Sequence, residues 1–296
     1  MSKKVSATRE QLRMTRKGKI MLFISRFLVY LVLIFLTVLC LFFFYLMLVN
    51  SSRSNAQLQS GFEPFFREHF FDNLKTAWLD ATINIPRGMW NSFVIAGLSA
   101  ILSTYFSALT AYGIHAYNFR GRKKLNNFIL VVMMIPSQVS AAGFIMLASK
   151  MGLKNSYIPL IVPAIASPVV YFYMKQYMES VLPLELVEAA RVDGANEFYT
   201  FNRIVMPIMM PAVAVQMIFS FVGSWNNFFI PAMLIDKPEK NTVPMMIATL
   251  RGADWKKFDM GEVYMLILLS ILPVIVVYLL LSKFIIRGVT AGGVKG

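Results

Sequence analysis

FLVYLVLIFLTVLCLFFFYLMLV, residues 27–49, is the stretch that decides the fold class. It contains no charged side chain, and it exceeds the roughly 20 residues that a helix rising about 1.5 Å per residue needs to cross a hydrocarbon core about 30 Å thick. A lead (1–26) with eight Lys and Arg residues precedes it, and SSRSN follows it in place of a small-x-small cleavage site. We therefore expect an uncleaved membrane anchor whose basic lead lies in the cytoplasm.

Apolar runs of similar length recur along the rest of the chain. The expected spans are residues 27–49, 91–116, 125–149, 157–174, 208–235 and 263–282. The chain is 57% hydrophobic and 15% charged, against roughly 25% charged in a soluble domain. The sequence therefore predicts an all-α integral membrane protein with six transmembrane helices.

The basic residues agree with a layout that has both termini in the cytoplasm. In this layout 18 of the 29 Lys and Arg residues lie in cytoplasmic segments, which explains the net charge of +14 better than nucleic-acid binding does. No nucleic-acid partner is therefore expected. The predicted segments are the lead (1–26), helix 27–49, an extracytoplasmic loop (50–90), a multi-helix core (91–284) that contains a cytoplasmic loop (179–207) and an extracytoplasmic loop (236–261), and a cytoplasmic tail (285–296).

The composition of individual spans predicts how they pack. Residues 91–116 are rich in Gly, Ala and Ser, which let helices approach closely in lipid, so this helix is expected to be buried. Loop 50–90 mixes aromatic and charged residues and is expected to form a short cap with an interfacial helix. Cys40, the single cysteine, excludes a disulfide within the chain and is assigned a packing role. Kinks are expected at or near the prolines Pro136, Pro159, Pro163, Pro168 and Pro273.

No charged side chain lies centrally in any expected span. This weakens an ion-coupled secondary transporter, which commonly needs a buried acid, without excluding one. The sequence has no G-x-x-x-x-G-K-[ST] phosphate loop, which excludes a P-loop ATPase, and no His, Cys or carboxylate cluster typical of a metal site or a hydrolytic triad. No catalytic, metal or cofactor site is therefore predicted in this chain, and a membrane enzyme or scaffold is the weaker alternative.

The most polar stretch on the predicted cytoplasmic side is LPLELVEAARVDGANEFYTFNRIVMP, residues 182–207. Its first half predicts a helix over residues 184–190, because Pro183 suits a first helical turn and Asp193-Gly194 is a natural stop. A second helix is expected to start at Asn196.

Helical spacing assigns the faces of this element. Leu184 and Val187 are expected to share a face with Arg191, while the acidic residues Glu185, Glu188 and Glu197 stay solvated. Its apolar edge suits docking into a groove of a partner. Periodicity favours equally an interfacial helix that only joins two spans.

The residues of this loop resemble the EAA-x3-G-x9-I-x-L-P signature of binding-protein-dependent ABC importer permeases. Met206 replaces the Leu of the signature, a volume-conserving change. Residues 220–235 and the tail 290–296, TAGGVKG, look like the fifth span and the end of the second membrane subunit of maltose-type sugar importers. The similarity covers roughly residues 90–296, and the leading residues match in layout rather than in motif. The matching positions of the signature are Glu188, Ala189, Ala190, Gly194, Ile204 and Pro207.

The resemblance implies a type I ABC importer permease fold in a prokaryotic plasma membrane, with this chain forming half of a sugar translocation pore. The implied partners are a second homologous permease, two ATPase subunits, an extracytoplasmic solute-binding protein and the sugar, and ATP and Mg belong to the ATPase subunits. By the same resemblance, Glu188 pairs with basic residues of an ATPase subunit and Gly194 permits the bend between the two short helices. The implied coupling residues are Glu188, Ala189, Ala190, Asp193, Gly194, Ile204 and Pro207.

The resemblance extends to three further groups of residues. The tail is expected to reach the ATPase dimer interface, with a frayed terminus as the alternative, through Gly292, Gly293, Val294, Lys295 and Gly296. The second outer loop is expected to project into the binding protein, unless Trp255 is an interfacial anchor, through Leu250, Arg251, Gly252, Ala253, Asp254 and Trp255. Candidate sugar contacts, which equally suit a role in fastening helices, are Asn91, Gln138, Gln216, Ser224, Asn226 and Asn227, with Trp225 or Phe228 stacking on a ring.

Overall fold

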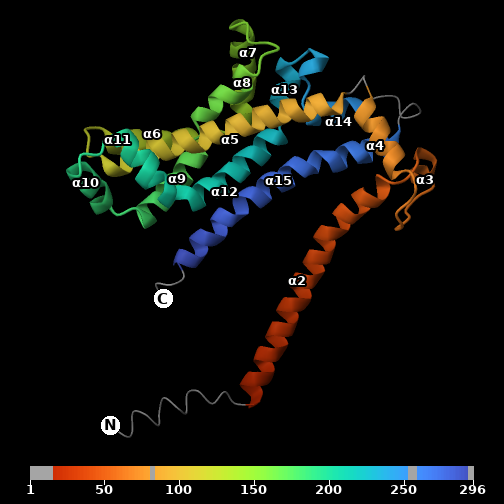
Figure 1. The fold of residues 1–296 in the computed structure, drawn as a ribbon, viewed down its shortest axis with the longest axis horizontal. Helices are drawn as coiled ribbons and strands as arrows, with labels where there is room; N and C mark the ends of the chain where they lie inside the picture. Colours follow the sequence, from red (N-terminus) through yellow and green to blue (C-terminus); the bar gives the residue numbers. More distant parts are fainter. Residues whose placement is uncertain (1–15, 81–83, 253–258, 293–296) are drawn as a thin grey trace.

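The computed structural model describes residues 16–80, 84–252 and 259–292, and within these ranges every regular element is a helix (Figure 1). Five helical segments are long and apolar enough to cross a membrane: Met21–Asn50, Ile85–Ala116, Ile158–Val181, Glu197–Trp225 and Met260–Ile285. A bent pair of shorter helices provides a sixth crossing when it is counted as one span. The prediction of an all-α membrane protein with six spans is confirmed.

The predicted third and fourth spans are interrupted at their prolines. The third consists of α6 (Arg122–Met133) and α7 (Ser137–Lys150), which meet at an angle of 97° around Pro136. The fourth consists of α8 (Ile158–Ile161), the 3₁₀ helix η1 (Val162–Ile165) and α9 (Pro168–Val181), each with a proline in its first turn. A proline has no N–H to donate and disfavours helical backbone in the residue before it, so each break begins where the sequence places one.

The predicted fifth span, residues 208–235, is wrong at both ends. The continuous helical segment starts at α11 (Glu197–Tyr199), passes through the π-helical η2 (Thr200–Val205) and ends with α12 (Met206–Trp225). Asn226 and Asn227 then close a tight turn onto the carbonyls of Val222 and Ser224, and a separate short helix, α13 (Phe229–Leu234), follows. Hydropathy alone cannot separate α13 from α12, because the sequence is equally apolar on both sides of the two asparagines.

Helix α5 (Ile85–Ala116) is the central element of the fold, as its small residues predicted. It packs along α12 and α9 and reaches α14 (Val243–Gly252) and α15 (Met260–Gly292) near its other end. The residues that it buries are mostly small, and they include Ser92, Ala96, Ser99, Ala100, Ser103, Ser107, Ala108 and Ala111. Small side chains at these positions let neighbouring backbones approach closely.

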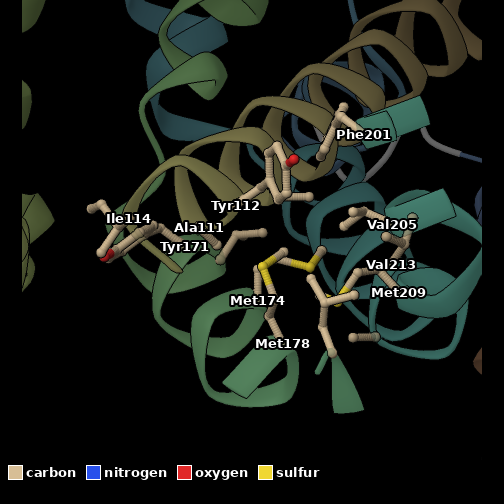
Figure 2. Close-up of a cluster of buried hydrophobic side chains, with 14 of the residues drawn as sticks. Ala111, Tyr112, Ile114, Tyr171, Met174, Met178, Phe201, Val205, Met209 and Val213 are labelled. Atoms are coloured by element: carbon tan, nitrogen blue, oxygen red, sulfur yellow. The ribbon is translucent and has the colours of Figure 1, made fainter. Parts of the chain in front are cut away.

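Two apolar clusters lie at opposite ends of α5. The first joins α5, α9 and α12 through Tyr112, Met174, Phe201 and Met209, as Figure 2 shows. The second joins α5 to α4 (Phe70–Leu79), α12, α14 and α15, with Phe221 and Trp225 stacked at a ring separation of 5.6 Å. The prolines and asparagines that interrupt the spans therefore leave α5 packed against its neighbours at both of its ends.

The predicted cap between the first two spans contains α3 (Asn55–Gln59) and α4. Arg53 is only 2% exposed, and its guanidinium donates to the carbonyls of Gln57 and Gly61. Asn73 Nδ2 donates to the carbonyls of Ser51 and Arg53, both at 2.9 Å. These bonds satisfy the polar backbone of the cap internally and hold it against the first turn of α15.

The first span, α2 (Arg16–Asn50), diverges from the other helices (Figure 1). Its membrane-spanning window has no buried residue, and it contacts α15 and the cap only near its Asn50 end. Cys40 is exposed on this helix, so the packing role assigned to it is wrong within this chain. The apolar side chains along α2 are therefore left uncovered by the other described helices.

The contact between the cap and α15 predicts a specific sensitivity at Gly261. An added Cβ would lie 2.7 Å from the backbone oxygen of Arg53 and 2.7 Å from Asn73 Nδ2. We expect Gly261→Ala to lower the stability by about 1–3 kcal/mol, as overpacking of a rigid contact does. Thermal unfolding of the purified protein in detergent measures this, with Gly97→Ala on α5 as the control, because no atom lies within 4 Å of its added Cβ. Equal melting temperatures for the two variants would contradict the packing described.

Candidate functional site

The loop 179–207, which the sequence predicts to be cytoplasmic and to couple to an ATPase, is called the coupling loop below and contains two helices joined by a glycine turn. The first, α10 (Leu184–Val192), follows Pro183 and ends at Asp193, close to the predicted bounds. Gly194 has a φ of +79°; its N–H donates to Arg191 O at 3.0 Å, and Ala195 N donates to Ala190 O at 2.9 Å. This is a Schellman motif, and its left-handed position is the reason that glycine occupies residue 194.

The second helix begins where the sequence predicted it. The side chain of Asn196 caps α11 by accepting from Tyr199 N at 2.8 Å. The chain then widens into the π-helical η2, which contains Ile204, before α12 starts. Pro207, in the first turn of α12, has no N–H for the carbonyl four residues earlier, which accounts for the π turn at this point. Ile204 and Pro207 therefore belong to the junction between the coupling loop and the fifth span.

An ion pair joins the two helices of the coupling loop to each other and to α5. Arg191 Nε donates to Glu197 Oε1 at 2.7 Å, and the Tyr112 hydroxyl donates to Glu197 Oε2 at 2.8 Å. The Arg191 guanidinium also lies 5.0 Å from the centre of the Tyr117 ring. The bond to Glu197 raises the pKa of Arg191 further above its ordinary value, and burial raises the pKa of Tyr117. Glu197 remains partly solvated, with its side chain 43% exposed, but the sequence did not predict that its carboxylate also binds Arg191 and Tyr112.

Apolar contacts anchor the same loop to three spans. Val187 is 1% exposed and packs in the first apolar cluster with residues of α5, α9 and α12. Ala190 is also buried. His115 Nε2, at the end of α5, lies 3.1 Å from the carbonyl of Leu182. The loop that contains α10 is therefore attached to all three spans.

The outward face of the loop differs from the predicted docking edge. Val187, one of the two apolar residues assigned to that edge, points into the protein's own core. The exposed apolar side chains are instead Leu184, Leu186, Val192 and Phe198, with Val192 87% and Phe198 73% exposed. Two acidic residues, Glu185 and Glu188, are exposed on α10, and Ala189 and Asp193 are exposed as well. Val192 and Phe198 could have been noticed as apolar residues on either side of the glycine turn.

The structure separates the candidate sugar contacts into two groups. Asn91 is buried, and its Nδ2 donates to the carbonyls of Glu239 and Asn241 at 3.0 Å, so it fastens α5 to the second outer loop. Gln216 is buried within α12. Ser224 is half-buried, whereas Gln138 on α7 and the two asparagines of the turn after α12 are exposed.

A pocket of about 410 Å³ lies at the break between α12 and α13. Trp225, Asn226 and Phe228 line one side of it, and residues of α14 and α15, including Pro244 and Ser270, line the other. The Trp225 ring itself stacks on Phe221 at 5.6 Å and is buried. Of the predicted sugar contacts, Asn226 and the two aromatic residues Trp225 and Phe228 line this pocket, and Ser270 is a polar neighbour that the sequence analysis missed.

Two other predicted groups lie mostly outside the described residues. In the second outer loop, Leu250 is half-buried against the second apolar cluster, and Arg251 and Gly252 end α14. Ala253, Asp254 and Trp255 are outside the described ranges. In the tail, Gly292 ends α15, and Gly293, Val294, Lys295 and Gly296 are outside them. Their assignments to a binding protein and an ATPase remain predictions.

Comparison with known proteins gives three related findings. A family described as "Binding-protein-dependent transport system inner membrane component" matches residues 103–291. The arabinooligosaccharides transport system permease protein AraQ of Bacillus subtilis (strain 168) is 35% identical over 229 residues, covering 76% of this chain and 79% of AraQ. The trehalose/maltose transport system permease protein MalG of Thermococcus litoralis is 29% identical over 267 residues, covering 89% of this chain and 94% of that protein.

Among solved structures, one chain of a bacterial ABC transporter involved in the import of the acidic polysaccharide alginate has the same fold. It superposes with a TM-score of 0.76 at 20% sequence identity, covering 91% of this chain and 98% of that one. The likeness extends well beyond the residues that the family match covers.

The ion pair of the coupling loop predicts non-additive mutations. We expect Arg191→Gln and Glu197→Gln to destabilise the protein separately, and the double variant to be more stable than the sum of the two losses predicts. The coupling free energy should be about 0.5–1 kcal/mol, because both side chains are partly exposed. Reversible unfolding in mixed micelles measures this coupling free energy. The same double-variant measurement on Lys175→Gln and Glu179→Gln provides the comparison, because these residues form an ion pair within the single helix α9. Strict additivity at Arg191 and Glu197 would show that the pair contributes nothing.

Proposed function

The chain belongs to the family of binding-protein-dependent transport system inner membrane components, and from this premise we propose that it serves an importer of oligosaccharides. It is a membrane permease subunit of an ATP-binding-cassette importer and is not itself an enzyme, since the ATPase activity of such importers lies in partner subunits. The names of the related permeases support a carbohydrate substrate, namely arabinooligosaccharides in one case and trehalose or maltose in another.

The pocket after α12 supports the same class of substrate. It combines an exposed asparagine amide, a serine hydroxyl and the ring of Phe228, which is 45% exposed. Amides and hydroxyls hydrogen-bond sugar hydroxyls, and an aromatic face stacks on the apolar face of a sugar ring. We assign Asn226 as the best candidate for a direct sugar contact and Asn91 to a structural role.

The proposed assembly contains three kinds of protein partner. A second homologous permease forms the other half of the pore, and two ATPase subunits, which hold ATP and Mg, bind the coupling loops. A solute-binding protein delivers the sugar to the outer loops. The proposed setting is a prokaryotic plasma membrane with both termini in the cytoplasm, as the distribution of Lys and Arg residues predicts.

The observation that carries this proposal is the geometry of the coupling loop. Its outer face presents exposed apolar side chains around Glu188, and its inner face is fixed to three spans by Val187 and by the Arg191–Glu197 pair. An ATPase subunit that grips the outer face can therefore move α5, α9 and α12 together. These spans would then alternate between conformations open to either side of the membrane.

Uptake by the assembled transporter in proteoliposomes tests the function. We expect labelled oligosaccharide to accumulate only when this chain, the second permease, the ATPase subunits, ATP and a loaded binding protein are all present. Omitting the ATPase subunits should abolish uptake even when a proton or sodium gradient is imposed. Uptake by this chain alone under such a gradient would overturn the proposal in favour of an ion-coupled carrier.

Charge reversal in the coupling loop tests its role. We expect Glu188→Lys to reduce ATP-driven uptake at least about tenfold with normal membrane insertion, because it places a cation against the basic groove proposed for the ATPase. Gly194→Pro should act similarly, since the left-handed backbone at residue 194 excludes proline.

The control is Glu185→Lys, the same charge change one turn earlier and outside the motif. It should reduce uptake by less than about threefold, since an exposed charge at the rim of an interface contributes little. Normal uptake by Glu188→Lys, or an equal loss in both variants, would remove the specific assignment of Glu188.

A further inference from the structure

A cationic pocket of about 670 Å³ lies at the turn between α5 and α6 and faces α9. Its lining contains four basic side chains from these elements, Arg122, Lys123, Lys124 and Lys175. The one acid in the lining, Glu179, forms an ion pair with Lys175 at 2.6 Å. In the part of the chain that the structure describes, no carboxylate pairs with the other three cations. The pocket therefore carries a net positive charge that the coupling loop does not neutralise.

The pocket also offers neutral hydrogen-bond donors beside these charges. The amides of Asn118, Asn126 and Asn127 line it. Asn126 is held in place because its Oδ1 accepts from the Tyr171 hydroxyl at 2.8 Å and its Nδ2 donates to Asn127 Oδ1 at 3.4 Å. Each NH₂ group carries two N–H donors, so a second N–H of Asn126 and the NH₂ group of Asn127 can serve a ligand. Cations and amide donors together favour an anionic ligand with several acceptor oxygens, such as a phosphate group.

An apolar surface continues from the mouth of this pocket. Phe119 lines the pocket, and on α6 the side chains of Leu125, Phe128 and Val131 are exposed at a spacing of three residues, which places them on neighbouring parts of one helical face. Phe128 is 64% and Val131 60% exposed. A cationic mouth that leads onto an exposed apolar helix face matches an amphiphile rather than a free anion.

The height of the pocket relative to the spans fits the same ligand. Helix α5 ends at Ala116 and α9 ends at Val181, and the pocket lies beside both ends, on the side of the coupling loop. In Figure 1, α6, α9, α10 and α11 gather at the same end of the molecule. This is the level at which lipid headgroups meet the ends of membrane helices.

We propose that this pocket binds the headgroup of an anionic glycerophospholipid, with its acyl chains along the exposed face of α6. Arg122, Lys123 and Lys124 neutralise the phosphodiester, and the amides of the pocket hydrogen-bond its oxygens. The site is separate from the proposed sugar pocket, which lies after α12 and is lined by α14 and α15.

Photo-crosslinking tests the proposal on the complete transporter in detergent. Phosphatidylglycerol with a photoreactive acyl chain should label residues 119–131, whereas the matching phosphatidylcholine should not. Lys123→Gln with Lys124→Gln should reduce this labelling at least about tenfold, because each cation near a headgroup contributes to binding. The control, Lys150→Gln with Lys154→Gln, removes the same charge from the region after α7 and should leave the labelling unchanged.

Three results would overturn the proposal. Equal labelling by the two lipids would show an apolar contact without headgroup recognition. Full competition by inorganic phosphate or glycerol phosphate would show a site for free phosphate. Unchanged labelling in the pocket variant, together with loss of the ATPase subunits from it, would assign the basic cluster to a protein contact. The labelling requires no transport, so a failure of the proposed sugar uptake would leave its outcome readable.

Discussion

The close approach of α5 to its neighbours is the constraint on which the rest of the structure depends. Apolar association gains little in lipid, since the acyl chains are as apolar as the side chains, so helices are held by close packing and by hydrogen bonds. The serines of α5 provide both. Ser99 donates to the carbonyl of Leu160 at 3.2 Å, and Ser107 donates to that of Ser167 at 3.4 Å. Both carbonyls belong to the fourth span, which prolines interrupt. The carbonyl of Leu160 cannot accept a 3₁₀ hydrogen bond, because the residue three positions later, Pro163, has no N–H.

Several parts of this architecture were predictable from the sequence because each depends on a local property. The apolar runs predicted the number of spans, and the small residues of 91–116 predicted the buried helix. The prolines of the third and fourth spans predicted their breaks, whereas α15 continues as one helix through Pro273. The glycine turn and the cap at Asn196 follow from backbone conformation and from short-range hydrogen bonds. These features require no knowledge of which helix lies beside which.

The parts that the sequence did not reveal depend on tertiary contacts. The sequence does not distinguish Glu197 from Glu185, since both are acidic residues of the same polar loop. Only the tertiary structure shows that Glu197 binds Arg191 and Tyr112. Asn91 suited a polar lumen equally well until the outer loop was seen to accept both of its hydrogen bonds. Mean hydropathy also does not show that Val187 points into the core, because it does not say which helix face packs against which. Nor does it show that the fifth span ends at Trp225, because two asparagines barely change the average over an apolar run.

The two attachments of the coupling loop have unequal strengths, and the difference suggests how it works. A partly exposed ion pair contributes about 0.2–1 kcal/mol, whereas full burial of a single Val, Leu or Phe side chain contributes about 1.5–3 kcal/mol. Val187, Leu182 and Phe201 are all buried in the same cluster, so apolar packing contributes most of the free energy that attaches the loop to the spans. The Arg191–Glu197 pair is directional instead, and it fixes the angle between α10 and α11 while Tyr112 ties that angle to α5. In the proposed coupling, a movement imposed on the outer face would shift α5, α9 and α12 together, because residues of all three helices pack against the loop in this one buried cluster.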